Sequence, residues 1–497
     1  MLQTIVFDDE ITLWWNRVAL SKREVFLLTI NGEKRPCTDK THYSFFGLQE
    51  CTAYTFTLDI VDETGNTVKR LDTVCVTTLK RKKRIDVTKA PYLAVGDGVT
   101  VNTACLQRAL DDCGQGECVY FPKGTYLTGA LNVHGDTEIY LEKDATLQGS
   151  SNLQDYMPKR KSRFEGTEMQ CYASLLNMGE LDRNGGYSCR NVVIRGGGAV
   201  LGGGKALAEN TIAYERERLQ EYLQKNADYV KECENANTIP GRARGRLIAM
   251  NNCQNILLSR VTLGFGPAWN IHFVYSENIV THGCKILSQG VWNGDGWDPD
   301  SSENCTVFDT EFCTHDDSIA IKSGKNPEGN IVNRPTKNIR IFDCYGKNGI
   351  AIGSEMSGGV DGVYIWDCQF GNSYSGVVLK TMRKRGGYIR NVCMHNSTFK
   401  SFAILTRLTY NNDGESAPTL PVIENIYAEN VTLTGERVLD DGTLQKTESL
   451  VIDGLPEKDY YVKNVTLKNL CVKSTDLQTW KIGGVDGLTI ENIRFID

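Results

Sequence analysis

The chain has 497 residues, a formal net charge of −6, 40% hydrophobic residues and 23% charged residues. This composition is typical of a folded protein, and the slightly acidic balance excludes the basic signature of a nucleic-acid partner. No stretch of 18 apolar residues occurs, so we expect no membrane span, and the N-terminus lacks the basic and apolar segments of a signal peptide.

The 17 cysteines stand mostly alone within hydrophobic runs and form no CxxC pair. This distribution predicts buried free thiols, no zinc site and a reducing, cytoplasmic location rather than a secreted disulfide scaffold. Cys113 and Cys118 are close enough in sequence to form one local bridge.

Residues 1–79 alternate apolar and polar residues in short runs separated by turn signals such as Asn31-Gly32. Several strands at this spacing predict a small β-sandwich, which we interpret as a packing module without chemistry of its own. The segment from Gly47 to Phe56 (GLQECTAYTF) resembles the corner motif of fibronectin type III domains. The basic run Lys80–Arg84 favours a solvated linker, which we place at residues 80–89.

At residue 90 the pattern changes. Residues 95–110 place a Gly-rich turn before an amphipathic helix with Leu106, Ala109 and Leu110 on one face, and a strand follows at residues 119–124. This pairing resembles the entry cap of the pectin-degrading right-handed β-helix enzymes. A solenoid needs such a cap because its first coil would otherwise expose an apolar end.

Beyond the cap, short strands recur that each open with Asn or Gly and an aliphatic residue. Neighbouring steps are often 23–26 residues, with longer gaps where loops intrude. This period predicts a parallel β-helix over residues 90–497, and the Leu-x-x-Leu-x-Leu signature of leucine-rich repeats is missing. The strand starts are Asn191, Asn255, Asn278, Asn338, Gly362, Asn391, Asn425, Asn464 and Gly487.

The repeats are interrupted by residues 206–236, which are highly charged and contain no Gly or Pro. We expect an exposed helix with a narrow apolar stripe of Tyr214, Leu219, Tyr222 and Leu223. Two interpretations stay open, a surface decoration and a wall or lid over a cleft.

Three acidic residues have a spacing that points to chemistry. Asp316 and Asp317 lie 21 and 22 residues beyond Asp295, about one coil of the solenoid. Adjacent strand residues face opposite ways, so both aspartates reach one site only from a turn or a strand end. Glycoside hydrolysis needs a carboxylic acid and a carboxylate, and crowding keeps one carboxyl protonated.

Four ordered motifs carry a resemblance to glycoside hydrolase family 28, the polygalacturonases. They are residues 293–298 (NGDGWD), 316–324 (DDSIAIKSG), 348–359 (NGIAIGSEMSGG) and 380–387 (KTMRKRGG). Residues 163–168 (RFEGTE) and 246–248 (RLI) resemble stretches of the exo-acting bacterial branch. The resemblance covers roughly residues 86–497 and implies a pectin-lyase-like β-helix without a cofactor.

The resemblance implies inverting hydrolysis, in which Asp316 is the general acid while Asp295 and Asp317 activate the attacking water. The separation of stacked coils alone does not indicate inversion. Substrate contacts are expected from a set that comprises Asn293, Lys322, Asn348, Lys380 and Arg163.

The sequence departs from the family pattern at two motifs. Asn348 stands where the third motif has His, and Val378 stands where the fourth has Arg. In the family that Arg and Lys380 hold the galacturonate carboxylate, a task suited to a bidentate guanidinium. Either another cation replaces the Arg or the accepted sugar differs; the candidate cations are Arg383, Lys384, Arg385, Lys322 and Arg163.

We therefore expect an enzyme that releases terminal galacturonic acid from pectic oligosaccharides. The nearest alternative is an exo-acting hydrolase of rhamnogalacturonan or other decorated pectic fragments. Two more distant alternatives are a calcium-dependent pectate lyase, which chelator would inactivate, and a non-catalytic β-helical carbohydrate-binding protein.

Overall fold

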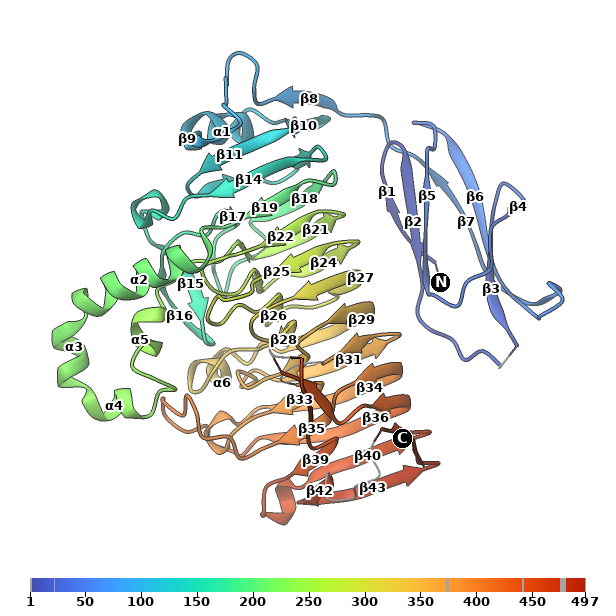
Figure 1. Cartoon of the computed structure of the whole chain (residues 1–497), viewed down its shortest axis with the longest axis vertical. Helices are drawn as coiled ribbons and strands as arrows, with labels where there is room; N and C mark the ends of the chain where they lie inside the picture. Colours follow the sequence, from blue (N-terminus) through green and yellow to red (C-terminus); the bar gives the residue numbers. More distant parts are fainter. Residues whose placement is uncertain (1, 22, 372–374, 440–441, 474–479, 497) are drawn as a thin grey trace. The chain divides into compact units, whose positions relative to one another are not determined.

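The computed structural model describes residues 2–21, 23–371, 375–439, 442–473 and 480–496. The chain divides into two compact units, Met1–Lys83 and Arg84–Asp497, which are described separately (Figure 1). No described helix is long and apolar enough to cross a membrane.

The N-terminal unit is built from two antiparallel sheets. One contains β1 (Gln3–Val6), β2 (Glu10–Trp14) and β5 (His42–Phe46), and the other contains β3 (Val25–Ile30), β4 (Glu33–Lys34), β6 (Ala53–Val61) and β7 (Thr67–Thr77). Ile11 and Leu13 from the first sheet share a core with Phe26, Leu28 and Phe56 from the second. The predicted small β-sandwich is therefore confirmed.

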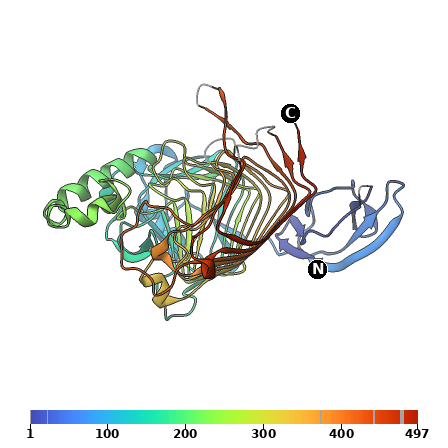
Figure 2. The same ribbon diagram turned by 90° about the horizontal axis from the view of Figure 1, so that it is seen from below.

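The second unit is a parallel β-helix (Figures 1 and 2). Its smaller parallel sheet, which carries the candidate site, receives one short strand from each coil in turn. These strands are β12 (Leu131–Val133), β17 (Leu176–Met178), β20 (Ile248–Asn251), β23 (Ile271–Val274), β26 (Trp297–Asp300), β28 (Ile319–Ile321), β30 (Ile350–Ile352), β33 (Val377–Lys380), β35 (Phe402–Leu405), β39 (Leu450–Asp453) and β42 (Trp480–Gly483).

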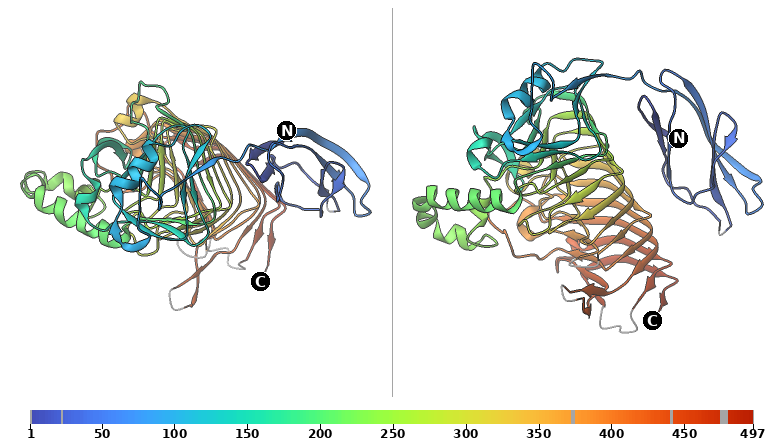
Figure 3. Two further views of the ribbon diagram at one scale, coloured as in Figure 1. Left: turned by 90° about the horizontal axis from the view of Figure 1, so that it is seen from above. Right: turned by 45° about the horizontal axis from the view of Figure 1, so that its top comes forward.

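The larger sheet forms the rest of the coil walls, and Figure 3 shows the coils stacked in register. Its strands are β8 (Lys83–Asp86), β9 (Asp97–Val101), β10 (Glu117–Phe121), β11 (Gly124–Thr128), β13 (Glu138–Leu141), β14 (Ala145–Gly149), β18 (Cys189–Arg195), β19 (Ala199–Leu201), β21 (Cys253–Ser259), β22 (Thr262–Gly264), β24 (Glu277–His282), β25 (Lys285–Leu287), β27 (Thr306–Cys313), β29 (Thr336–Gly346), β31 (Val360–Trp366), β32 (Gln369–Phe370), β34 (Tyr388–Phe399), β36 (Val422–Leu433), β40 (Val462–Lys468), β41 (Cys471–Val472), β43 (Val485–Glu491) and β44 (Arg494–Phe495). Two antiparallel hairpins lie outside the coils, β15 (Arg160–Phe164) with β16 (Thr167–Cys171) and β37 (Glu436–Val438) with β38 (Leu444–Lys446).

The interior of the β-helix is a stack of like residues. Ile319, Ile350, Val377, Phe402 and Leu450 follow one another in register across five coils, and each is buried. Burying one such side chain stabilises the fold by roughly 1.5–3 kcal/mol, so the repeated aliphatic positions account for the long continuous core.

The asparagines that open the repeats have two structural roles. Asn255, Asn278 and their equivalents adopt positive φ near 55°, a conformation that Asn and Gly tolerate best. The side-chain amide of Asn278 also donates to Asn255 Oδ1 at 3.1 Å, and Asn464 donates to Asn425 Oδ1 at 3.0 Å. The recurring residue therefore turns the chain and links successive coils.

The cap is the predicted one. Helix α1 (Thr103–Asp111) buries Leu106, Ala109 and Leu110, as expected, over the first coil. Residues 83–86, expected to belong to the linker, instead form β8, which pairs with β10. The first coil therefore begins inside the basic run.

The charged segment forms several short helices that project from the coils (Figure 2). They are α2 (Gly204–Arg218), α3 (Gln220–Lys225), α4 (Ala227–Lys231) and α5 (Thr238–Gly241); α6 (Glu328–Val332) lies elsewhere, between β28 and β29. The segment is helical and largely exposed, as expected, and Tyr214 and Tyr222 are about half exposed at 48% and 47%. Helix α2 buries Leu207, Ile212 and Glu215, and the Glu215 carboxylate accepts hydrogen bonds from Lys159, Tyr172 and Arg218.

All 17 cysteines lie within the described residues, and each is a free thiol. The local bridge between Cys113 and Cys118 is therefore not formed. Several buried thiols act as core residues, and Cys344 and Cys368 also donate to backbone carbonyls of their own or the neighbouring coil.

Candidate active site

The three aspartates come from turns on adjacent coils. Asp295 lies in the turn before β26, while Asp316 and Asp317 lie between β27 and β28. The two turns are joined because Gly296 N donates to Asp317 O at 3.0 Å and Asp316 N donates to Gly294 O at 3.4 Å. The chain therefore brings residues 21 positions apart into one cluster, and the adjacent pair escapes strand alternation because it sits in a turn.

The aspartates line a cavity of about 200 Å³ on the outer side of the smaller sheet. Trp269 contributes an aromatic surface to the cavity, and Glu234, Tyr410 and Asn411 contribute from segments outside the coils. Glu234 belongs to the chain between α4 and α5, so the charged insertion reaches the site. The position of Glu234 favours the second interpretation, in which residues 206–236 form a wall beside the cavity.

The wall is fixed by buried ionic contacts. Arg242 donates to Glu165 at 2.8 Å and to Asp413 at 3.0 Å, and Tyr229 donates to the same Asp413 at 2.8 Å. The backbone N–H of Glu234 donates to Asn411 Oδ1 at 2.7 Å. These contacts join the insertion to the loop after β35, which carries Tyr410 and Asn411.

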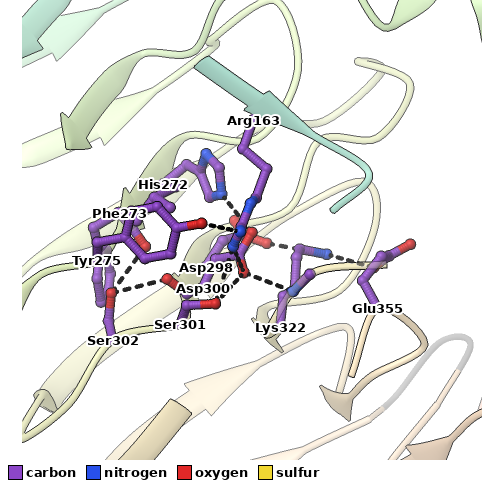
Figure 4. Close-up of polar contacts among 12 residues, drawn as sticks. Arg163, His272, Phe273, Tyr275, Asp298, Asp300, Ser301, Ser302, Lys322 and Glu355 are labelled. Atoms are coloured by element: carbon purple, nitrogen blue, oxygen red, sulfur yellow. Dashed lines mark hydrogen bonds and ion pairs between the residues drawn. The ribbon is translucent and has the colours of Figure 1, made fainter. Parts of the chain in front are cut away.

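Lys322, just after β28, lies among three carboxylates, of which Figure 4 labels those of Asp298 and Glu355. Its ammonium is 3.3 Å from Asp295, 3.5 Å from Asp298 and 3.6 Å from Glu355. Burial, followed by the Asp298 charge, raises the pKa of Asp295 well above its usual value, and burial raises the pKa of Asp298 to about 7. The two carboxyls titrate as a pair, which holds a proton near neutral pH.

Asp316 is also shifted toward its protonated form. Burial first, and then the charge of Asp317, raises the pKa of the Asp316 carboxyl, although Lys380 partly opposes the shift. Lys380, at the end of β33, is 2.9 Å from Asp317 Oδ2. Asp316 therefore resembles a general acid in its environment, beside a carboxylate neutralised by a lysine.

Asn293, Lys322 and Lys380 line the cavity together with the three aspartates. Asn293 is oriented by Arg244, whose guanidinium donates to Asn293 Oδ1 at 2.7 Å. Burial lowers the pKa of Arg244 to about 9, and its position beneath the turn shows a supporting role.

Two expected substrate contacts lie outside the cavity lining. Arg163 is fully buried and pairs with the fully buried Asp300 at 2.8 Å, so it does not meet substrate (Figure 4). Asn348 is 3% exposed, and its amide N–H groups donate to Thr314 O and Asp316 O. Asn348 therefore stabilises the turn that carries Asp316, a role that the sequence did not predict.

The candidate replacements for the missing arginine are already paired within the protein. Arg385 is buried and donates to Ser354 O, Asn326 Oδ1 and Asn411 O. Arg383 pairs with Glu457, and Lys384 pairs with Glu232. Among the described residues that line the cavity, the cations are Lys322 and Lys380.

Several site residues were missed from the sequence. Asp298 and Glu355 lie inside the quoted motifs, so the motifs themselves were a signal for them. Glu234 and Tyr410 belong to irregular segments with no repeat pattern. Only the path of the chain in space places them at the cavity.

Trp297 is fully buried in the core, where its ring packs against Phe273 with centroids 5.0 Å apart. Trp269 lines the cavity and lies 4.4 Å beneath the Lys322 ammonium. Packing therefore explains Trp297, and Trp269 is the tryptophan placed beside the aspartates.

The chain is 26% identical over 472 residues to an exo-poly-alpha-D-galacturonosidase of Dickeya chrysanthemi, which covers 90% of this chain and 77% of that protein. It is 28% identical over 422 residues to a probable polygalacturonase of Vitis vinifera, which covers 80% of this chain and 76% of that protein.

Two solved structures share the fold. The family 28 exopolygalacturonase of Yersinia enterocolitica superposes with a TM-score of 0.80 at 19% identity, over 100% of this chain and 97% of that one. The exopolygalacturonase of Thermotoga maritima superposes with a TM-score of 0.68 at 25% identity, over 83% of this chain and 91% of that one. The family model described as glycosyl hydrolases family 28 matches residues 122–486, and the chain therefore belongs to this family of glycoside hydrolases.

Proposed function

We propose that the protein is an exo-acting polygalacturonase-like hydrolase that releases terminal galacturonic acid from pectic oligosaccharides. The observation that carries this proposal is the cluster of Asp295, Asp316 and Asp317 on stacked turns in one cavity. The relatives named above, which include an exo-poly-alpha-D-galacturonosidase, support the choice of substrate.

In this mechanism Asp316 protonates the glycosidic oxygen, and Asp295 with Asp317 orients and deprotonates the attacking water. Burial and the charge of Asp317 raise the pKa of Asp316, which favours the protonated form that a general acid needs. Burial also raises the pKa of Asp295, but the Lys322 ammonium at 3.3 Å opposes that shift and favours the carboxylate that a base needs. The expected stereochemical outcome is inversion, which the family membership supports.

Exo action is supported by the wall described above. Glu234 and Tyr410 enclose the cavity at its margin, and the insertion that carries Glu234 is held to the loop of Tyr410 by Arg242 and Asp413. A wall of this kind limits the cavity to the end of a sugar chain.

The first test is incubation of the pure protein with trigalacturonate in the presence of EDTA, with the products separated over time. The proposal expects galacturonate and digalacturonate to appear first, with no unsaturated product. Unsaturated products, or loss of activity in EDTA, would instead indicate a calcium-dependent lyase.

The second test uses the variant Asp316→Asn. We expect kcat to fall by about 10²–10⁴-fold because the general acid is lost. Asn retains the oxygen that accepts the hydrogen bond from Asp317 N at 2.9 Å, so stability should change little. Asp486→Asn, an exposed change on β43, is the matched control and should retain full activity. An active Asp316→Asn enzyme would remove Asp316 from the mechanism.

We further propose that the N-terminal unit is fibronectin type III-like. The Tyr54 hydroxyl accepts a hydrogen bond from the backbone N–H of Gln49, within the motif noted in the sequence. Replacement of Tyr54 by Phe should lower the stability of this unit by about 1 kcal/mol. An unchanged unfolding transition for Met1–Lys83 would argue against this role.

We also propose a cytoplasmic location, which the 17 free cysteines support. Cell fractionation with detection of the protein tests it, and recovery outside the cytoplasm would refute it.

A further inference from the structure

A second hollow adjoins the catalytic cavity. It has a volume of about 630 Å³ and shares Asp317, Lys380 and Tyr410 with that cavity. It extends over the outer face of β33, β35 and β39, toward the C-terminal coils. A sugar bound across the aspartates therefore continues into this groove.

The floor of the groove is apolar, although it lies on an outer face. Val378, Ala403 and Val451 point outward and follow one another in register on three successive coils. Leu405 and Leu408 extend the same apolar surface.

One column of residues on the larger sheet is charged instead. Glu424, Lys463 and Asp486 follow one another there in register. Ala351 and Ala320 continue the apolar column on the two preceding coils, where both are fully buried, whereas Val378, Ala403 and Val451 line the groove.

The groove has no arginine among the described residues that line it. Its cations are Lys380, which pairs with Asp317 at 2.9 Å, and Lys400, which is 7% exposed. Glu448 lies at the rim and pairs with Lys481. A carboxylate over this floor would lose its water without gaining a bidentate partner, which is unfavourable.

We propose that this groove is a subsite for an uncharged pyranose residue, one whose carboxyl is absent or esterified. The inference rests on the proposed function, since the terminal galacturonate occupies the catalytic cavity and the next residue occupies the groove. The apolar C–H face of the ring, or a methyl group on it, packs on Val378, Ala403 and Val451. Val378, which stands where the family motif has Arg, is the specificity-determining residue.

Two sources supply this chemistry, a methyl-esterified galacturonate and a neutral 6-deoxy sugar. The test compares three disaccharides: digalacturonate, digalacturonate methyl-esterified on its reducing-end residue, and galacturonosyl-α-1,2-rhamnose. We expect kcat/KM for at least one uncharged acceptor residue to exceed that for digalacturonate by about tenfold or more. The disaccharide with the higher kcat/KM of these two identifies whether the subsite takes an esterified galacturonate or a 6-deoxy sugar.

The variant Val378→Arg should reverse this order, since it supplies a guanidinium for the carboxylate and removes part of the floor. Val378→Ala is the matched control, which shortens the side chain without adding charge and should keep the preference for the uncharged residue. If Val378→Arg fails to fold, Ala403→Arg places the same group on the next coil in register and should produce the same reversal.

Binding separates failure of this inference from failure of the proposed function. Titration of the Asp316→Asn variant with the same three disaccharides, followed by calorimetry, measures the subsite without turnover. Tighter binding of the uncharged forms supports the subsite even if none is hydrolysed by the wild type, an outcome that refutes only the proposed hydrolysis. Equal or tighter binding of digalacturonate, or no binding of any of the three, overturns the inference.

Discussion

Replacement of Arg163 by Met is expected to destabilise the β-helix by about 3–5 kcal/mol, because it leaves the buried carboxylate of Asp300 without its cation. Both side chains are fully buried, and Arg163 Nη1 lies 2.8 Å from Asp300 Oδ1. Asp300 retains hydrogen bonds from Gly324 N at 3.0 Å and from Ser301 Oγ at 3.5 Å, and His272 Nε2 lies 3.5 Å from its other oxygen, which favours the lower half of that range. The double variant with Asp300→Asn should recover most of the loss, since it removes the unpaired charge.

The pH dependence of the unfolding free energy provides a second test of the pair formed by Arg163 and Asp300. Burial raises the pKa of Asp300, but Arg163 and His272 outweigh burial and lower it to about 2. A folded pKa below the unfolded value of about 3.9 stabilises the fold above that pH and loses the contribution as pH falls toward 2. The stability gap between wild type and Arg163→Met should therefore narrow on acidification below about pH 4.

The assay is urea unfolding followed by circular dichroism between pH 3 and pH 7, with kcat and KM measured on the same samples. A structural Arg163 predicts a lower unfolding midpoint with KM nearly unchanged. A variant of wild-type stability with a KM raised tenfold or more would refute this reasoning and return Arg163 to the substrate contacts.

Three further predictions concern the site and the coils. Asp298→Asn removes a charge that raises the pKa of Asp295, so the acidic limb of the plot of kcat/KM against pH should move to lower pH by on the order of one unit. An unchanged limb would show that the two carboxyls do not influence each other's titration. Asn348→Ala should lower kcat by roughly 10²-fold because the Asp316 turn loses two hydrogen bonds, whereas a rise in KM alone would indicate substrate contact. Asn278→Ala should lower the free energy of urea unfolding by about 1–2 kcal/mol, because the side-chain hydrogen bond to Asn255 is lost and Ala is strained at a φ of 55°. Asn278→Gly loses the same hydrogen bond but tolerates that φ, so it should cost less, and equal losses would contradict the backbone argument.

The repeat pattern was sufficient to predict the fold. Each coil must bury aliphatic side chains inside and turn at a fixed place, so both requirements appear locally in the sequence, as at Asn278 and Ile279. The same holds for α1, whose buried face was predicted residue by residue because a helix of nine residues has a regular period. Interruptions were less predictable. Helix α2 buries Leu207, Ile212 and Glu215, and Lys159 and Arg218 pair with the buried carboxylate.

The sequence by itself was sufficient to predict that the three aspartates cluster. Their spacing of 21 and 22 residues is one coil, so they lie together however the surrounding side chains pack. Only the tertiary structure showed which other residues contact the aspartates or line their cavity. Arg163 and Asn348 have the residue types of substrate contacts, yet one neutralises the buried Asp300 and the other supports the turn of Asp316. Val378 already departed from the family motif in the sequence, but only the register placed it beside Ala403 and Val451 on the floor of the groove. The physical reason is that solvent exposure and charge pairing depend on segments distant in the chain, which no local pattern encodes.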